Sequence, residues 1–227
     1  MQLTASEGTA PAAADLDLAE GPPGRDFSEI EERVVRLFAL VGEGVSAATY
    51  AFLNGDRGAA NRLIAADGQI DLLQAEVEDL VQRELMAPAP LREQDLRLLL
   101  SVVRIVPELE RSGDLVEHIA LRSGQGLAGQ LTPRCRGLLG EMGRIGAQMW
   151  RIAGDAFAER DDGAAEALRA RDDELDDLHV DLTAEMAAGR LSVAVAIEMG
   201  LVARFFERLG DHAVNVARRV RYLSDRT

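Results

Sequence analysis

The sequence Glu207-Arg208-Leu209-Gly210-Asp211 occurs near the end of this chain, and a close copy, Glu110-Arg111-Ser112-Gly113-Asp114, stands 97 positions earlier. Upstream of each copy a second pattern recurs at a constant offset of 105. Its acidic members are Asp67 and Asp71 in the first half, and Asp172 and Asp176 in the second. The motif recurs after 97 positions and the upstream aspartates after 105, so the segment between the aspartates and the motif is longer in the first half. We interpret the chain as a duplicated unit with one loop difference.

Length and composition limit the fold and the ligands. The chain has 227 residues, of which 47% are hydrophobic and 4% aromatic, and this favours helices packed through aliphatic side chains. No apolar run is long and uncharged enough to span a membrane, and no secretory leader is expected. The single Cys135 cannot form an internal disulfide, which favours the cytoplasm. A net charge of −14 repels nucleic acid and attracts cations.

The chain divides into a tail, two repeats and a linker. Residues 1–26 are rich in Ala, Pro, Gly and Asp, and we expect a disordered acidic tail. The segment 123–132 is rich in glycine and has the composition of a flexible linker. Residues 27–122 and 133–225 are then the first and second repeat. Ser28 has the capping-box spacing that predicts a helix start, and Thr132-Pro133 supplies a cap with a proline in the first turn.

Apolar residues step by three and four along most of the chain, which predicts amphipathic helices. Asn54-Gly55 should end the first helix, and Pro88 and Pro90 should force a loop after the second. The expected helices are 28–54, 57–85, 92–122, 133–159, 163–188 and 191–223. Alternating β-branched runs are absent from the sequence. The fold class is therefore all-α, with two three-helix bundles in tandem.

Both copies of the motif place two carboxylates on one helix face. Residues four apart lie about 5 to 6 Å from each other at their β-carbons, so Glu110 is a neighbour of Asp114, and Glu207 of Asp211. Because each residue rotates the helix by about 100°, these acids point away from the apolar stripe. Like charges at this spacing cost a few tenths of a kcal/mol per pair, a penalty that a bound cation would reverse. Carboxylate oxygens on adjacent helices suit Mg, Mn, Ca or oxidised iron.

A plain solvated surface is the alternative interpretation of these acids. Such a surface has no need for a fixed glycine or a fixed spacing, and both are repeated here. Gly113 and Gly210 each cost about 1 kcal/mol inside a helix, which suggests close approach of a neighbouring helix, with or without a ligand. His118, His179 and His212 lie near the acidic positions and could contribute to a site. Pro107 has Arg204 as its counterpart, so the two sites should differ.

The sequence does not suggest an enzyme. It contains no nucleophile with a base and an orienting group, and no glycine-rich phosphate loop. Dinuclear-iron bundle enzymes use Glu-x-x-His pairs, and the nearest approach here is Asp176-Asp177-Leu178-His179. We therefore expect no catalytic residues. A metal-storage or metal-dependent redox bundle is the alternative function, and such a bundle should oxidise iron catalytically.

Residues 27 to 225 resemble the PhoU family of phosphate-uptake regulators. The resemblance is carried by both motif copies, by the extension of the second copy through His212-Ala213-Val214-Asn215-Val216-Ala217, and by Pro90-Leu91-Arg92-Glu93-Gln94-Asp95-Leu96-Arg97. It implies two three-helix bundles related by pseudo-twofold symmetry. It also implies multinuclear metal sites on the acidic helical faces, holding iron, zinc, manganese or magnesium. The first copy departs from the fuller motif at Ser112, Glu117 and His118.

Transferred residue by residue, the resemblance implies two ligand sets. One set is Asp67, Asp71, Glu110 and Asp114, and the other is Asp172, Asp176, Glu207 and Asp211. Asp173 and Asp177 give a second register for the latter. The implied role is that of a cytoplasmic regulator held at the inner face of the membrane by its partners. Those partners are the nucleotide-binding subunit of the phosphate ABC transporter and a sensor histidine kinase, whose starvation response it holds off. The resemblance leaves a homodimer open.

Overall fold

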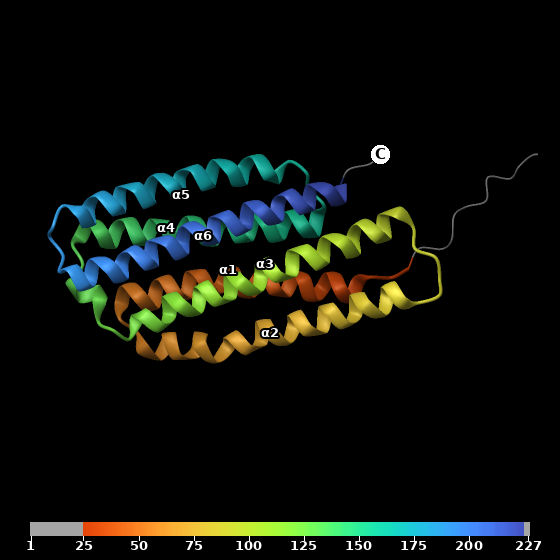
Figure 1. The fold of residues 1–227 in the computed structure, drawn as a ribbon, viewed down its shortest axis with the longest axis horizontal. Helices are drawn as coiled ribbons and strands as arrows, with labels where there is room; N and C mark the ends of the chain where they lie inside the picture. The colour runs from red at the N-terminus through yellow and green to blue at the C-terminus, as the bar shows by residue number, and fades with distance from the viewer. Residues whose placement is uncertain (1–24, 225–227) are drawn as a thin grey trace, which may run out of the picture.

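A computed structural model describes residues 25–224, which form six long α-helices and one short 3₁₀-helix (Figure 1). The elements are α1 (Ser28–Asn54), α2 (Arg57–Met86), α3 (Glu93–Ser123), η1 (Leu127–Gln130), α4 (Pro133–Glu159), α5 (Ala164–Ala187) and α6 (Val193–Ser224). This range contains no β-strand, and each helix end lies within two residues of its expected place. The all-α fold class is confirmed. The expected tail 1–26 lies outside the described residues, apart from Arg25 and Asp26.

Local chemistry sets several helix ends as expected. Gly55 closes α1 in the left-handed conformation, with φ of 63°, which costs glycine little because it has no Cβ. Thr132 caps α4, since its hydroxyl accepts a 3.1 Å hydrogen bond from the Cys135 N–H, and Pro133 follows in the first turn. The end of α1 and the start of α4 could therefore be predicted from two or three residues of sequence.

The predicted capping box at Ser28 is wrong, although α1 begins at that residue. The residue before the helix is Phe27, which has no side-chain cap. The Ser28 N–H instead donates to the Asp26 carboxylate at 2.9 Å. An acid two positions upstream thus satisfies the N–H of Ser28, one of the free donors of the first helical turn.

The helices pack in an arrangement that repeats itself. Helices α1 and α3 of the first repeat pack on α4 and α6 of the second, while α2 and α5 lie on opposite outer sides (Figure 1). Each contact within the first three helices recurs within the last three, and the pairs α1–α4 and α3–α6 join the repeats. This is the pseudo-twofold arrangement that the resemblance to the PhoU family implied.

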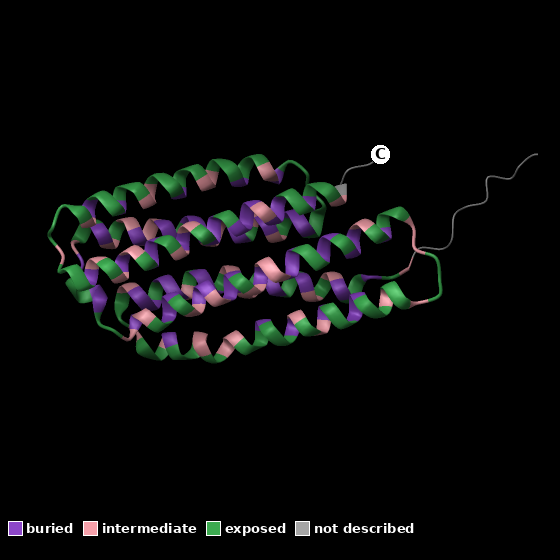
Figure 2. Ribbon diagram, viewed as in Figure 1, coloured by how far each residue is buried: buried purple, intermediate pink, exposed green. Residues whose placement is uncertain are grey.

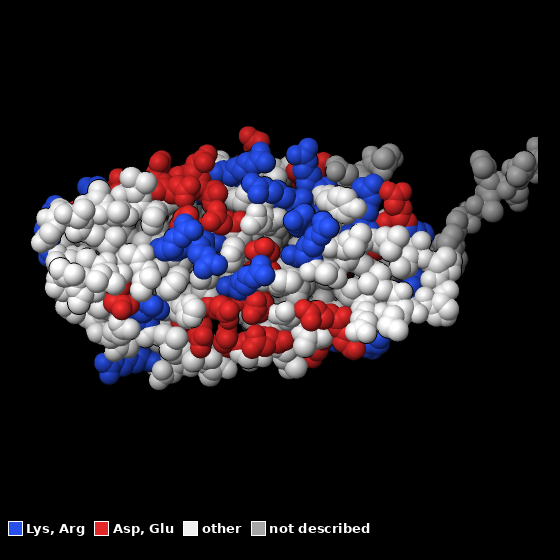
Figure 3. Space-filling model, in the orientation of Figure 1, with Lys and Arg blue, Asp and Glu red and all other residues white. Residues whose placement is uncertain are grey.

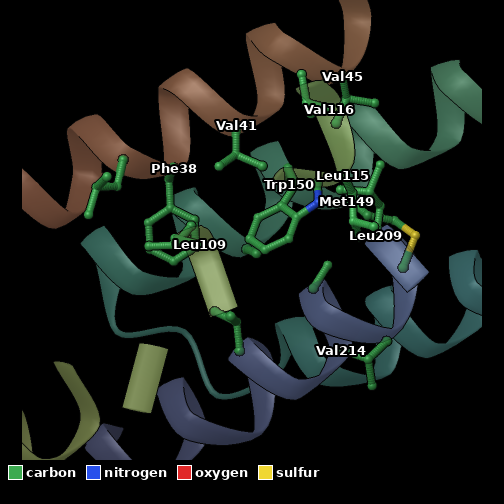
Figure 4. Close-up of a cluster of buried hydrophobic side chains, with 14 of the residues drawn as sticks. Phe38, Val41, Val45, Leu109, Leu115, Val116, Met149, Trp150, Leu209 and Val214 are labelled. Atoms are coloured by element: carbon green, nitrogen blue, oxygen red, sulfur yellow. The ribbon is translucent and has the colours of Figure 1, made fainter. Parts of the chain in front are cut away.

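One hydrophobic core runs through both repeats (Figure 2). In Figure 4 side chains from four helices converge on Trp150 of α4, among them Phe38 of α1, Leu109 of α3 and Leu209 of α6. Trp150 is fully buried, with a ring-centroid distance of 6.2 Å to Phe38. The two bundles expected from the sequence therefore share their interior, and the sites on α3 and α6 are built on one rigid centre.

The segment between the repeats is packed against the bundle. Its middle forms η1, and the side chains of Leu127, Ala128 and Leu131 are buried. The flexible linker expected from the glycine content is thus wrong for these residues. Burial of the three apolar side chains stabilises the packed segment by more than the conformational entropy of the glycines would favour a flexible one.

Contrary to the expectation from the sequence, one described helix, α1, is long and apolar enough to cross a membrane by length and composition alone. Half of its most apolar window is buried inside the protein, as in a core helix. Its buried side chains include Val34, Leu37, Val41 and Val45, which pack in the shared core.

Candidate metal centre

The first acidic cluster is formed by Asp67 and Asp71 of α2 with Glu110 and Asp114 of α3. The two helices pack side by side, which brings the four carboxyl groups into mutual electrostatic range. Burial raises the pKa of Asp67, and the negative charges of Glu117, Asp71 and Asp114 raise it further. Burial likewise raises the pKa of Glu110, with Asp114 and Asp71 adding to the effect. At Asp67 and Glu110, burial and the neighbouring carboxylates therefore outweigh the opposing charges of His118 and Arg111.

The second acidic cluster is formed by Asp172 and Asp176 of α5 with Glu207 and Asp211 of α6. Burial, followed by the charges of Asp176 and Asp211, raises the pKa of Asp172 to about 6. Burial also raises the pKa of Glu207, with Asp211 and Asp176 adding. The exposed Asp173 lies close enough to raise the pKa of Asp172 as well. The structure thus places each predicted set on two packed helices, within electrostatic range of one another.

The repeated glycines allow the helices of each cluster to approach. A Cβ added to Gly113 would lie 2.7 Å from Ile70 Cδ1 and 3.5 Å from an Asp67 carboxylate oxygen. A Cβ added to Gly210 would lie 2.7 Å from both Asp172 Oδ1 and Leu175 Cδ2. Only glycine leaves room for these contacts, so the glycine that the motif repeats places an aspartate of α2 or α5 against the backbone of α3 or α6.

The two clusters differ at Glu207. Its carboxylate pairs with the Arg204 guanidinium, and its Oε2 atom is buried without a hydrogen-bond partner. In the first repeat the position that corresponds to Arg204 is Pro107, so Glu110 has no arginine at that place. A buried carboxylate oxygen that lacks a donor is a place that a cation fits.

The clusters are not closed cages. Among residues 25–224, no three His, Cys, Asp or Glu side chains already stand close enough together to chelate one ion. Holding a metal would require the carboxylates of α2 and α3, or of α5 and α6, to turn toward each other. Carboxylate oxygens provide the hard donors that such an ion prefers.

The three histidines take different positions. The exposed ring of His118 lies 5.4 Å from the Phe205 ring, and His179 lies within electrostatic range of Glu207. His212 is buried, and its Nδ1 lies 2.9 Å from the Ser112 hydroxyl. His212 therefore joins α3 to α6, a role that the sequence analysis missed.

The Ser112–His212 contact has an apolar counterpart. At the offset of 97, Ser112 becomes Leu209, and Leu115 becomes His212. Leu115 and Leu209 lie in the shared core (Figure 4). The pseudo-twofold axis thus relates the polar pair Ser112–His212 to the apolar pair Leu115–Leu209. In the sequence, the sign of this difference was that Ser112 stands where the second copy of the motif has Leu209.

The metal-free protein should respond to pH through Asp172. Its pKa is raised from 3.8 to about 6, so the folded state binds a proton more tightly, and the charged form destabilises the fold above pH 6. Solvent screening at this half-buried group reduces the effect to about 1 kcal/mol. Asp172→Asn should therefore raise the thermal midpoint by about 3 °C at pH 7.5 in chelator. That gain should disappear toward pH 4, and a gain independent of pH would contradict the assignment.

Comparison with known proteins identifies the family of this chain. A family model described as the PhoU domain matches residues 34–123 and 139–220. The chain belongs to the PhoU family. The phosphate-specific transport system accessory protein PhoU homolog 2 of Mycobacterium tuberculosis is 33% identical over 197 residues, covering 86% of this chain and 92% of that protein. PhoU homolog 1 of the same organism is 33% identical over 200 residues, covering 87% and 90%.

Solved PhoU structures share the fold. The crystal structure of PhoU from Pseudomonas aeruginosa matches with a TM-score of 0.80 at 27% identity, covering 86% of this chain and 95% of that one. The phosphate transport system regulatory protein PhoU from Streptococcus pneumoniae matches with a TM-score of 0.75 at 25% identity, covering 86% and 93%. Both repeats of the chain therefore have counterparts in PhoU structures.

Proposed function

We propose that this chain is a non-enzymatic cytoplasmic regulator that restrains phosphate-starvation signalling. It acts as an adaptor between the nucleotide-binding subunit of the phosphate ABC transporter and a sensor histidine kinase. These partners hold it at the inner face of the membrane. In this role the chain needs surfaces rather than a catalytic site.

The observation that supports this proposal is the nearly full-length match to curated PhoU homologues. Two of them are named phosphate-specific transport system accessory proteins, and each alignment covers at least 90% of the relative. Both acidic motifs lie within the matched residues 34–123 and 139–220. A shared role in phosphate transport is the simplest reason for similarity over such a length.

We further propose that both acidic clusters bind divalent or trivalent metal. A cation between α5 and α6 would remove the repulsion that raises the pKa of Asp172, and it would give the buried Glu207 oxygen a partner. The same reasoning applies to Asp67 and Glu110 between α2 and α3. The metal would brace the outer helices against the inner ones, and its binding would change the charge of that surface.

Deleting the gene tests the adaptor function. Starvation-response genes should become active in phosphate-rich medium, reaching the level of starved wild-type cells, because the restraint on the kinase is lost. The intact chain supplied in trans should silence them again. The measurement is a reporter fused to a starvation-response promoter, followed during growth at high phosphate.

A second deletion provides the control. If the single deletion strain still represses the reporter, deletion of any paralogue in the same strain separates redundancy from error. Normal repression in the strain lacking both genes would refute the regulatory function. Derepression in that strain, reversed by this chain alone, would support it.

A further inference from the structure

Two apolar patches on α3 and α6 occupy equivalent places in the two repeats. On α3 the side chains of Leu96 and Leu100 are 40% and 46% exposed. At the offset of 97 these become Val193 and Ile197 of α6, which are 77% and 60% exposed. In each pair the residues are four apart, so they lie on one helix face. We call the first pair the α3 patch and the second pair the α6 patch.

The patches lie at opposite ends of one surface. The Arg97 guanidinium stands 5.3 Å from the Tyr222 ring, which places the start of α3 beside the end of α6. The ion pair between Arg122 and Glu198, at 3.0 Å, places the end of α3 beside the start of α6. The two helices therefore run antiparallel, and uncharged surface is seen at both ends of the face they form (Figure 3). We call this surface the α3–α6 face.

The centre of the α3–α6 face is basic. Arg111 and Arg208 stand at the same position of the repeated motif, and both are exposed. Both lie near His212. Burial lowers the pKa of its imidazole most, Glu108 and Asp211 oppose this, and the positive charges of Arg208 and Arg111 lower the pKa further. Figure 3 shows basic side chains between two acidic groups on this side of the molecule. On a chain with a net charge of −14, this centre is a local exception.

Exposed apolar residues on the outer helices lack this pattern. Leu72 of α2 is 61% exposed, but its repeat counterpart is Asp177. Val180 of α5 is 65% exposed, but its counterpart is Ala75. Single exposed apolar side chains are ordinary on protein surfaces. The α3 patch and the α6 patch, by contrast, are exposed at equivalent places in the two repeats, with Arg111 and Arg208 between them. A binding partner that covers both patches should have the same twofold symmetry.

We propose that the α3–α6 face binds a homodimeric protein whose twofold axis passes between the Ser112–His212 pair and the Leu115–Leu209 pair. Each subunit covers one apolar patch, and acidic side chains close to the partner's axis pair with Arg111 and Arg208. A homodimer presents the same surface twice, so it needs two equivalent docking sites related by a twofold axis. This inference rests on the proposed adaptor function and adds the symmetry and the surface of the partner.

The test measures affinity and stoichiometry with two purified probes. These are the cytoplasmic part of the sensor kinase and the nucleotide-binding subunit of the phosphate transporter in the presence of ATP. Native mass spectrometry should find one chain for two subunits of the partner. Leu100→Asp and Ile197→Asp should each weaken binding by about tenfold or more in calorimetric titration, and the double variant should lose it. Arg111→Gln with Arg208→Gln should reduce the salt dependence of association.

Matched variants control for the introduced charge. Val180→Asp and Leu72→Asp add the same charge at exposed apolar positions away from the α3–α6 face. Their affinities should stay within about twofold of the unmodified chain, since their side chains would touch no partner. Circular dichroism and the thermal midpoint of every variant check that the fold is retained.

The outcomes separate this inference from the proposed function. If the unmodified chain binds a probe and the double variant binds it equally well, the adaptor function stands and the assigned surface is wrong. A complex of one chain with one subunit, sensitive to one patch only, would overturn the twofold arrangement. If the double variant instead changes only the self-association of the chain, the face is an interface between copies. If the unmodified chain binds neither probe, both proposals fall.

Discussion

Gly143→Ala should lower the free energy of unfolding by about 2 to 3 kcal/mol, as expected for overpacking at a buried helix contact. Gly143 of α4 faces Thr49 of α1, and an added Cβ would overlap both the Thr49 hydroxyl oxygen and its Cγ2 atom. Thr49 is held in place, because its hydroxyl donates a 2.7 Å hydrogen bond to the Val45 carbonyl. The methyl group would therefore push apart the two helices that join the repeats. Urea unfolding measures the effect.

Two variants make this expectation specific. Gly137 lies on the same helix with no atom within 4 Å of an added Cβ, so Gly137→Ala should raise the free energy of unfolding by about 0.5 to 1 kcal/mol. Thr49→Gly removes the obstructing side chain, and in the double variant with Gly143→Ala the two changes should couple by about 1 kcal/mol or more. Equal stabilisation by Gly143→Ala and Gly137→Ala would show that α1 and α4 do not approach at this point.

Helix number and helix ends followed from short-range chemistry. Gly55 and Thr132-Pro133 carry their own conformational preferences, so they could be interpreted without knowing what they pack against. The apolar period of three and four fixed the inward faces in the same way. Ser28 failed as a cap because the structure places Phe27 at the cap position, so Ser28 lies in the first turn and its N–H donates to Asp26.

The joining of the repeats could not be predicted from local patterns. The contact between Gly143 and Thr49 depends on the register of α1 against α4, and the sequence pattern of either helix leaves that register free. The hydrogen bond between Ser112 and His212 spans 100 positions. The sequence marked Ser112 only as a departure from the second copy, without identifying its partner.

The acidic clusters were more predictable because the duplication gave the pattern twice. Repetition of Gly113 as Gly210 indicated close helix approach, and the structure places aspartates of α2 and α5 at those glycines. The ion pair of Arg204 with Glu207 was missed, although residues three apart on a helix are neighbours. Its importance depends on the burial of Glu207, which no local pattern reveals.

Glu207→Ala with Asp211→Ala should remove most of the metal that the second acidic cluster holds. The double variant leaves only Asp172 and Asp176 on one helix of this cluster, and two carboxylates from a single face give a hard cation too few ligands. Elemental analysis of the purified protein by mass spectrometry measures the metal content per chain. The same substitutions remove like charges, so the thermal midpoint in chelator should stay equal or rise. Metal loss would then not result from unfolding.

The control for this loss has the same change of charge on another surface. Glu43 of α1 and Asp155 of α4 are exposed, and their replacement by Ala should leave the metal content unchanged. Replacement of Asp173 and Asp177 separates the two registers on α5, since a loss confined to that pair would move the ligands one position along the helix. Metal content equal to that of the unmodified chain after removal of Glu207 and Asp211 would refute the site. In that case the raised pKa of Asp172 would reflect crowded carboxylates alone, and the repeated glycines would serve only helix packing.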